Sequence, residues 1–250
     1  MNIVIIGTGY VGLVTGVGLA SLGNNINFLD LDENKIQNLS NKKITFYEPG
    51  LEEYFNDDET FSRMFFSSDY ASIEWQNIDI VFVCVQTPNN LETNSVDTNF
   101  LESAIKEINN VNNDDLVITI KSTIPPYEIE KVCEKVGMDS SKLTFNPEFL
   151  REGTAVEDFF KPDRIVLGGT NNEKLNKLKE LYTDFDCEII TTDSISSQLI
   201  KYLANTYLPL RLSFVNEATR LIDYSGGNLD DVLKGVGLDN RIGQHYFRPS

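Results

Sequence analysis

The sequence has no long apolar run and far fewer basic than acidic residues. Its 250 residues include 21 Lys and Arg against 38 Asp and Glu, which gives a formal net charge of −17 at pH 7. This deficit excludes nucleic acid as a partner, because binding to its phosphates needs a basic surface. The apolar runs are too short to cross a bilayer, so we expect no membrane segment. The N-terminus itself predicts a strand, and no signal peptide is visible.

Cysteine and histidine are also scarce. Cys84, Cys133 and Cys187 are widely spaced and odd in number, a pattern that predicts neither a metal site nor a disulfide framework and favours a reducing, cytoplasmic location. Cys84 lies inside an apolar run, and we interpret it as a small buried hydrophobe. His245 is the only histidine. Because no nucleophile pairs with it, we expect a surface or packing residue there.

What the sequence does contain is a strong pattern in its first thirty residues. An apolar, β-branched run at 2–6 predicts a buried strand; Gly7-Thr8-Gly9-Tyr10-Val11-Gly12 and a helical pattern at 13–22 follow. In a dinucleotide-binding turn the first glycine permits the tight turn and the second lets the backbone approach a pyrophosphate. The third lets the helix lie close to the strand. The N-terminus of that helix would offer its unpaired N–H groups to the phosphates.

Asp30 completes this pattern. It ends a second predicted strand, 18 residues after Gly12, where a carboxylate can accept hydrogen bonds from both hydroxyls of a ribose. An acid there favours NAD over NADP, because a 2′-phosphate would face a like charge. The alternative is a glycine-rich turn in a parallel α/β protein that binds nothing.

Predicted strands and helices alternate up to about residue 192. Apolar strands are expected at 79–85, 116–120, 165–169 and 187–190. The fold class is therefore α/β: a Rossmann-type, doubly wound, mostly parallel sheet over residues 1–192. Residues 193–250 form a second region, with one long helix at 194–224, kinked or opened at Pro209, and a short helical segment after it. A helix of this length outside a sheet packs against another domain or another subunit.

A few polar residues stand where chemistry could occur. Thr87 and Thr123 follow predicted strands at the edge where open α/β sheets bind ligands, although Thr123 is equally suited to cap the next helix. Lys201 and Asn205 are four apart and share a helix face, where they could hold an oxyanion. On spacing alone, a solvated lysine is the simpler interpretation. Glu148 and Glu152 are also four apart and alone would suggest a solvated charged turn.

Taken together, these pieces resemble the UDP-glucose/GDP-mannose dehydrogenase family. The matching stretches run in the family's order through nearly the whole chain. They are residues 7–12, Thr87-Pro88, Lys121-Ser122-Thr123, NPEFLREG at 146–153, KYLAN within the helix at 200–207, and Arg241-Ile242-Gly243 followed by His245-Tyr246. The NPEFLREG and KYLANTY stretches are the most specific of these.

The resemblance implies an NAD-dependent, two-step oxidation of the 6-hydroxyl of a nucleotide sugar, UDP-glucose first among them, to the uronic acid by way of a thiohemiacetal and a thioester on a cysteine. It implies catalytic roles for Lys201, Asn205, Glu152 and Thr123. The residues implied to face NAD are Gly7, Gly9, Tyr10, Val11, Gly12, Asp30, Lys35, Thr87, Thr123 and Glu152. Those implied to bind the UDP-sugar are Glu148, Phe149, Leu150, Arg151, Glu152, Lys201, Asn205, Arg241, Tyr246, Phe247, Arg248, Pro249 and Ser250. It implies no metal, and a homodimer formed through the helix at 194–224.

One departure from the family pattern is informative. The family's nucleophilic cysteine follows a glycine-rich segment beyond the position of Ser250, and none of the three cysteines here matches it. We therefore expect the N-terminal part of a dehydrogenase, without the C-terminal nucleotide-sugar domain, that binds NAD but does not complete the oxidation. The alternatives are a dehydrogenase of another nucleotide sugar (GDP-mannose or a UDP-N-acetylhexosamine), a non-catalytic NAD-binding module, and a related hydroxyacid dehydrogenase.

Overall fold

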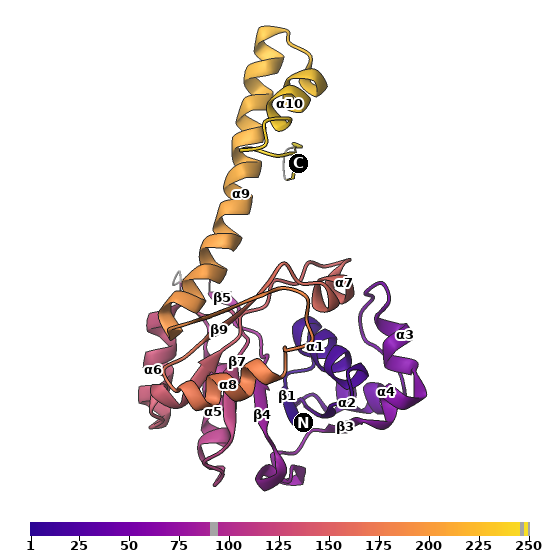
Figure 1. The fold of residues 1–250 in the computed structure, drawn as a ribbon, viewed down its shortest axis with the longest axis vertical. Coiled ribbons are helices and arrows are strands. Elements are labelled where there is room, and N and C mark those ends of the chain that lie inside the picture. Colours follow the sequence, from indigo (N-terminus) through magenta and orange to yellow (C-terminus); the bar gives the residue numbers. More distant parts are fainter. Residues whose placement is uncertain (91–94, 246–247, 250) are drawn as a thin grey trace. The chain divides into compact units, whose positions relative to one another are not determined.

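The computed structural model describes residues 1–90, 95–245 and 248–249. It divides the chain into two compact units, Met1–Leu199 and Ile200–Ser250, with the division inside helix α9 (Ser194–Ser225). Figure 1 shows the elements of both units. Among the described residues, no helix combines the length and the apolar character needed to pass through a membrane.

The first unit is built on one eight-stranded sheet in the order β10-β9-β8-β7-β4-β1-β2-β3. Neighbouring strands from β3 to β8 are parallel, whereas β9 pairs antiparallel with β8 and parallel with β10. The strands are β1 (Asn2–Ile6), β2 (Asn25–Leu29), β3 (Met64–Ser67), β4 (Ile80–Val83), β7 (Val117–Ile120), β8 (Leu143–Phe145), β9 (Arg164–Gly168) and β10 (Glu188–Thr192). The predicted mostly parallel sheet is confirmed.

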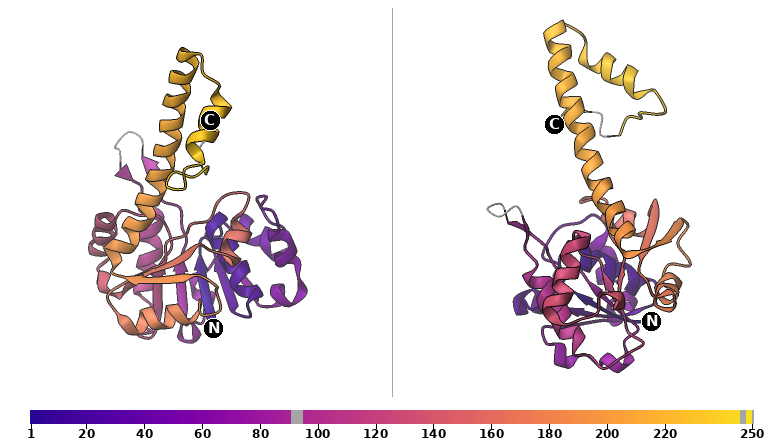
Figure 2. Two further views of the ribbon diagram at one scale, coloured as in Figure 1. Left: turned by 45° about the horizontal axis from the view of Figure 1, so that its top comes forward. Right: turned by 90° about the vertical axis from the view of Figure 1, so that its left-hand side faces the viewer.

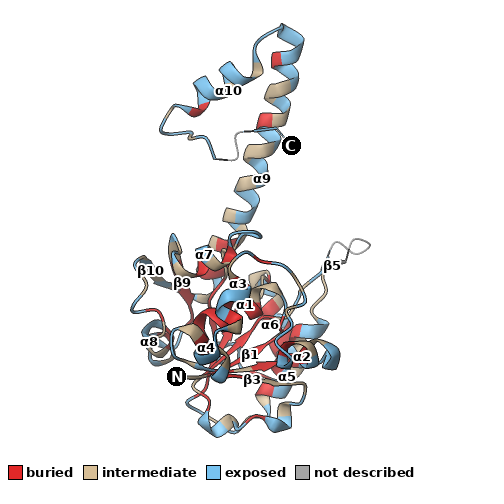
Figure 3. Ribbon diagram, turned by 90° about the vertical axis from the view of Figure 1, so that its right-hand side faces the viewer, coloured by how far each residue is buried: buried red, intermediate tan, exposed pale blue. Residues whose placement is uncertain are grey.

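Helices cover both faces of this sheet because its strands are apolar on both sides (Figure 3). Along β1, Ile3 and Ile5 join one buried cluster with residues of α1, α3, α7 and α8, while Val4 and Ile6 join a second with residues of α5 and α6. The helices of this unit are α1 (Tyr10–Ser21), α2 (Glu33–Ser40), α3 (Leu51–Asn56), α4 (Asp58–Ser62), α5 (Asn99–Asn109), α6 (Pro126–Val136), α7 (Ala155–Phe160) and α8 (Asn172–Glu180), with short 3-10 turns η1 (Tyr70–Ser72), η2 (Trp75–Asn77) and η3 (Ser140–Lys142).

A small hairpin differs from the sequence expectation. The polar composition of residues 89–98 predicts a loop, but this segment contains the antiparallel pair β5 (Asn89–Asn90) and β6 (Ser95–Val96). This pair forms its own two-stranded sheet and stands away from the main one (Figure 2). Residues 84–88 connect the carboxyl end of β4 to this pair.

The second unit contains the rest of α9 and helix α10 (Leu229–Gly237). Helix α9 is unbroken through Pro209, so the expected opening of the helix there is absent. The segment after α10 is tied to α9 by Arg211, whose Nη2 donates to the carbonyl of Ile242 at 2.7 Å. Asn228 caps α10 by accepting from the N–H of Asp231.

Candidate active site

The turn after β1 accepts only glycine at two of its positions. Gly7 has φ +95°, and a Cβ there would lie 2.8 Å from the carbonyl oxygen of Cys84. A Cβ on Gly12 would lie 1.9 Å from the carbonyl oxygen of Gly7, so the helix lies directly against the turn. Gly9 differs, since nothing lies within 4 Å of a Cβ placed on it. The turn is therefore closed at Gly7 and Gly12 and open at Gly9.

Gly9 also precedes the first turn of α1, which begins at Tyr10 and has no side-chain cap. The leading N–H groups of the helix therefore receive no side-chain cap, next to the open space at Gly9. Such a helix start binds phosphate groups through these N–H groups and the positive end of the helix dipole. The turn has the shape and polarity that a pyrophosphate requires.

Asp30 is held beside this turn at the end of β2. Its Oδ2 accepts from both the N–H and the Oγ1 of Thr8, each at 2.8 Å, and lies 3.1 Å from Nζ of Lys35 on α2. Although burial raises the pKa of Asp30, the hydrogen bonds from Thr8, Asp32 and Lys35 hold it below its usual value. An ionised carboxylate therefore faces the glycine turn.

Thr87 and Thr123 meet at the carboxyl edge of β4 and β7. The hydroxyl of Thr87 donates to the carbonyl oxygen of Thr123 at 2.7 Å. Thr123 does not cap the following helix, because α6 begins after Pro125 without a side-chain cap. The two threonines predicted to face NAD are thus adjacent, and both are partly exposed.

A buried polar group next to this edge was not identified from the sequence. Nζ of Lys121 donates to Oδ1 of Asn146 at 2.9 Å, and the hydroxyl of Tyr182 donates to the same oxygen at 2.7 Å. Nδ2 of Asn146 donates to the carbonyl of Val166 on β9. These hydrogen bonds hold the start of the NPEFLREG stretch against three elements: the end of β7, the segment after α8, and β9. The available signal was the position of Lys121 and Asn146 directly after apolar strands.

The predicted sugar-binding stretch continues from Asn146 along the first unit. Glu148 is half-buried, and its Oε2 accepts from the N–H of Leu150 at 2.7 Å. The ring of Phe149 lies under the guanidinium of Arg164, 3.7 Å from its centroid. Arg151 donates from N and Nε to Oδ2 of Asp158, at 2.8 and 3.0 Å. Glu152 follows on an exposed turn.

Glu48 ties this stretch to the glycine turn, and sequence reasoning gave it no role. Its carboxylate accepts from the hydroxyl of Tyr10 at 3.1 Å and from the N–H groups of Gly153 and Ala155 at 2.9 and 2.8 Å. The hydroxyl of Tyr10 also lies 2.8 Å from the carbonyl oxygen of Arg151. The structure therefore brings Tyr10 of the predicted cofactor turn together with the segment that carries Glu152.

The remaining predicted residues belong to the second unit. Lys201 is buried and Asn205 is exposed. Arg241 is exposed and pairs with Asp239 through Nε and Nη2, at 3.0 and 2.6 Å. Arg248 and Pro249 are exposed, whereas Tyr246, Phe247 and Ser250 lie outside the described residues. That these residues share one sugar pocket with residues 148–152 stays a prediction.

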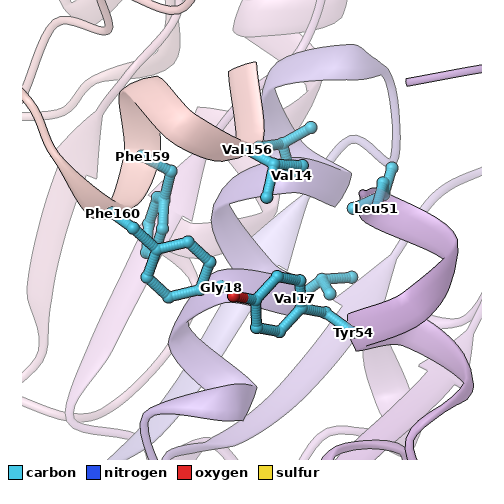
Figure 4. A pocket seen from close by; sticks show the side chains of 8 residues that line it. All are labelled: Val14, Val17, Gly18, Leu51, Tyr54, Val156, Phe159 and Phe160. Carbon is cyan, nitrogen blue, oxygen red and sulfur yellow. The ribbon is translucent and has the colours of Figure 1, made fainter. Parts of the chain in front are cut away.

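The first unit also has a shallow apolar depression between α1, α3 and α7 (Figure 4). Its lining is aliphatic and aromatic, and the rings of Tyr54 and Phe160 lie 4.8 Å apart. The lining residues are Val14, Val17, Gly18, Leu51, Tyr54, Val156, Phe159 and Phe160. A nucleotide needs polar partners, so this depression belongs to helix packing and not to the cofactor site.

The doubly wound sheet, the glycine turn and the acid after β2 define a dinucleotide-binding domain. Comparison with known proteins places it more closely. Residues 1–186 match the NAD binding domain of the UDP-glucose/GDP-mannose dehydrogenase family, and residues 195–250 match its central domain. The chain belongs to this family, and its cofactor is NAD.

Two curated relatives and two solved structures illustrate the similarity. The UDP-glucose 6-dehydrogenase of Rickettsia felis is 40% identical over 252 residues, which cover 99% of this chain and 56% of that protein. UDP-glucose 6-dehydrogenase TuaD of Bacillus subtilis is 36% identical over 252 residues, covering 99% and 54%. The chain thus spans a little over half the length of these relatives.

Among solved structures, a UDP-glucose dehydrogenase from Pyrobaculum islandicum superposes with a TM-score of 0.88 at 34% identity, covering 98% of this chain and 58% of that one. A GDP-mannose dehydrogenase from Pseudomonas aeruginosa gives a TM-score of 0.87 at 26% identity, covering 100% and 60%. Both are similar to this chain through its two units. The expected family and fold class are confirmed.

The residues present fit NAD. The open space at Gly9 lies beside uncapped N–H groups of α1, and an ionised Asp30 stands next to it. This carboxylate can accept from ribose hydroxyls, whereas it would repel a 2′-phosphate. Among the described residues, no group of three or more His, Cys, Asp or Glu side chains is arranged to hold a metal ion.

Proposed function

We propose that this chain is the cofactor-binding and central part of an NAD-dependent UDP-glucose 6-dehydrogenase, which oxidises the 6-hydroxyl of UDP-glucose to the carboxylate of UDP-glucuronate. The observation that carries the proposal is the pair of hydrogen bonds from the hydroxyl of Tyr10 to the carbonyl oxygen of Arg151 and to the carboxylate of Glu48. Through it, the segment bearing the acid predicted to act on the sugar lies against the turn that fits NAD. The identity to curated relatives of that name supports the choice of substrate.

In this proposal the first unit binds and orients the cofactor. The N–H groups at the start of α1 bind the pyrophosphate. Asp30, which is oriented by its bonds to Thr8 and Lys35, binds the adenosine ribose. Thr87 and Thr123 face the cofactor at the edge of β4 and β7. NAD supplies the acceptor for hydride, and the oxidation needs two such acceptors in turn.

On the sugar side of the reaction, the roles are proposed residue by residue. Residues 148–152 of the first unit are proposed to bind the UDP-sugar, and the same role is proposed for Arg241 and residues 246–250. Lys201 and Asn205 share a face of α9 and stabilise the oxyanions that form as the 6-carbon is oxidised. Glu152 orients the water that releases the acid, and Thr123 holds a water near the reacting carbon.

The thiohemiacetal and thioester of this route need a reactive thiol that the three cysteines do not provide. Burial raises the pKa of Cys84 to about 12 and that of Cys133 to about 11. Burial also raises the pKa of Cys187, which adjoins β10. A nucleophilic cysteine needs a lowered pKa and access to substrate. We therefore assign the nucleophile to none of these residues.

A second candidate is the same reaction on GDP-mannose or a UDP-N-acetylhexosamine. The similarity to the GDP-mannose dehydrogenase structure favours it, because that protein covers the whole of this chain at nearly the same TM-score. Measuring the binding of UDP-glucose, GDP-mannose and UDP-N-acetylglucosamine to the NAD-loaded protein separates the two candidates. Preferential binding of UDP-glucose supports the first, and preferential binding of another sugar overturns it.

The family assignment is tested on the 250-residue chain by calorimetry and by absorbance at the NADH wavelength. We expect NAD to bind and NADP to bind much more weakly. We expect no sustained NADH production with UDP-glucose, because none of Cys84, Cys133 and Cys187 is a suitable nucleophile. Failure to bind NAD would remove the proposal, and sustained turnover would show the cysteine argument to be wrong.

A further inference from the structure

Glu48 is a buried carboxylate in the connector between α2 and α3, and the groups that its side chain bonds are far away in the sequence. It is 4% exposed. Its Oε2 accepts from the hydroxyl of Tyr10 and from the N–H of Gly153, and its Oε1 accepts from the N–H of Ala155. Burying a charge is costly unless hydrogen bonds replace its water. Here the N–H groups of Gly153 and Ala155 do so, together with the hydroxyl of Tyr10, whose one proton is shared with the carbonyl oxygen of Arg151.

Hydrogen bonds fix the backbone of the residue before Glu152 and of the residue after it. The residue before it, Arg151, has its carbonyl oxygen 2.8 Å from the hydroxyl of Tyr10. The residue after it, Gly153, donates its N–H to Glu48. Tyr10 is the first residue of α1, directly after the open turn at Gly9. The backbone on either side of Glu152 is thus fixed to the helix start that fits a pyrophosphate.

The hydrogen-bond donors around residue 48 fit a carboxylate better than an amide. A carboxylate has two acceptor oxygens, whereas glutamine has one acceptor oxygen and an NH₂ group that only donates. In a glutamine at this position the NH₂ group would face the N–H of either Gly153 or Ala155. Burial and Glu48 together raise the pKa of Tyr10, so its hydroxyl keeps the proton that it donates. The donors and acceptors match best with a carboxylate at residue 48.

We propose that Glu48 is a positioning residue that holds Glu152 in register with the dinucleotide turn, acting through the backbone of residues 151–155 and through Tyr10. The inference rests on the proposed function in one respect, since it takes Glu152 to face NAD. According to this proposal, the fixed conformation of residues 151–155 and the affinity for NAD both depend on the side chain of Glu48, which touches neither the cofactor nor the sugar.

The first test is hydrogen exchange on the 250-residue chain, comparing Glu48→Gln and Tyr10→Phe with the control Glu53→Gln. Glu53 is exposed on α3 and carries the same charge. Of the amides of Gly153 and Ala155, we expect the one that faces the new NH₂ group to exchange about 10- to 100-fold faster in Glu48→Gln, the range for lost hydrogen bonds to a charged group. Tyr10→Phe should act in the same direction more weakly, and Glu53→Gln should change nothing.

The location of the change decides between positioning and general destabilisation. Faster exchange confined to residues 150–158, with β1 and β4 unchanged, supports the proposal. Unchanged exchange at 150–158, or an equal increase across the whole sheet, overturns it. If Glu48→Gln fails to fold, Tyr10→Phe decides the question, since it removes one hydroxyl and leaves the carboxylate paired with both N–H groups.

The second test is a double-mutant cycle on the NAD dissociation constant, using Glu152→Gln in the native and Glu48→Gln backgrounds. If Glu48 acts by positioning Glu152, the effect of Glu152→Gln in the Glu48→Gln background should fall to less than half of its native factor. Two effects that simply multiply would overturn the proposal. If Glu152→Gln leaves NAD affinity unchanged in both backgrounds, the role given to Glu152 under the proposed function fails, and the exchange result alone decides the role of Glu48.

Discussion

Thr8 donates two hydrogen bonds to one oxygen of Asp30, one from its backbone N–H and one from its hydroxyl, each 2.8 Å long. The turn after β1 and the end of β2 are thereby joined at the carboxylate expected to bind the ribose. The other oxygen, Oδ1, accepts from the N–H of Asp32 at 3.1 Å. The acid is oriented before any ligand arrives, which reduces the entropy lost on binding.

Replacing Asp30 with alanine should weaken NAD binding far more than NADP binding. The carboxylate accepts hydrogen bonds from the ribose hydroxyls of NAD and repels the 2′-phosphate of NADP. Its loss therefore removes an attractive interaction from NAD but not from NADP. Hydrogen bonds to a charged group correspond to about 10- to 100-fold in affinity for NAD. Calorimetric titration with both cofactors measures the ratio. Glu33→Ala, which removes an exposed charge from the start of α2, should leave it unchanged. Equal weakening of both cofactors would refute the assignment.

Alanine at Gly9 and alanine at Gly12 should have opposite consequences. At Gly9 the new methyl meets open space, so the fold should persist with an unchanged melting temperature while NAD binding falls at least tenfold. At Gly12 the methyl would lie 1.9 Å from the carbonyl oxygen of Gly7, which forces the turn and α1 apart. Overpacking of this kind costs about 1–3 kcal/mol or more.

Thermal unfolding and NAD titration of the two variants distinguish these outcomes. Gly12→Ala should lower the melting temperature even without ligand, and Gly9→Ala should not. A stable Gly12→Ala protein that still binds NAD would show that helix α1 does not need its close approach to the turn.

The elements predicted well from sequence are those fixed by local pattern. The turn at residues 7–12 and the strands on either side depend on short-range rules, so their order and the place of Asp30 follow directly. The antiparallel pairing of β9 with β8 could not be predicted in this way. The direction of strand β9 depends on the path that residues 146–163 take across the edge of the sheet. That path is set by contacts such as the bond from Asn146 to Val166.

Glu48 shows what a single sequence hides. Its partners Tyr10, Gly153 and Ala155 lie 38 to 107 residues away, and its neighbours Pro49 and Gly50 suggest only a turn. The sequence does not distinguish a buried glutamate from an exposed one, because burial depends on segments that are distant in the chain. The candidate site could be predicted as a set of motifs, whereas the bonds that hold the motifs together could not.

Acid should loosen the segment that carries Glu152. Although burial raises the pKa of Asp158, hydrogen bonds from Arg151 and Thr154 hold it below its usual value. A depressed folded-state pKa stabilises the fold above the unfolded value of about 3.9, and this contribution disappears as pH falls through the folded value. Asp158→Asn should therefore destabilise the protein by about 1 kcal/mol at pH 7, discounted for the exposed Arg151, and by progressively less as pH falls below the unfolded-state pKa.

Urea unfolding of wild type and Asp158→Asn between pH 3 and pH 7 measures this difference. Asp163→Asn is the matched control, because Asp163 is 94% exposed and lies 3.8 Å from Arg164. Its effect should be small at every pH. A difference between wild type and Asp158→Asn that stays constant down to pH 3 would show that the ionised carboxylate does not hold this segment.

The chain should form a homodimer through an apolar stripe on α9. Within the second unit, Leu203, Tyr207, Leu210, Phe214 and Leu221 are 58–67% exposed. Their spacing of four, three, four and seven places them on one helix face, as in a two-helix seam. Leu210→Glu with Phe214→Glu would place two charges in that seam and should convert a dimer to a monomer, as measured by sedimentation equilibrium. Ser213→Glu, an exposed position outside the stripe, should leave the mass unchanged. A wild-type monomer, or a dimer that survives the double substitution, would rule out this face.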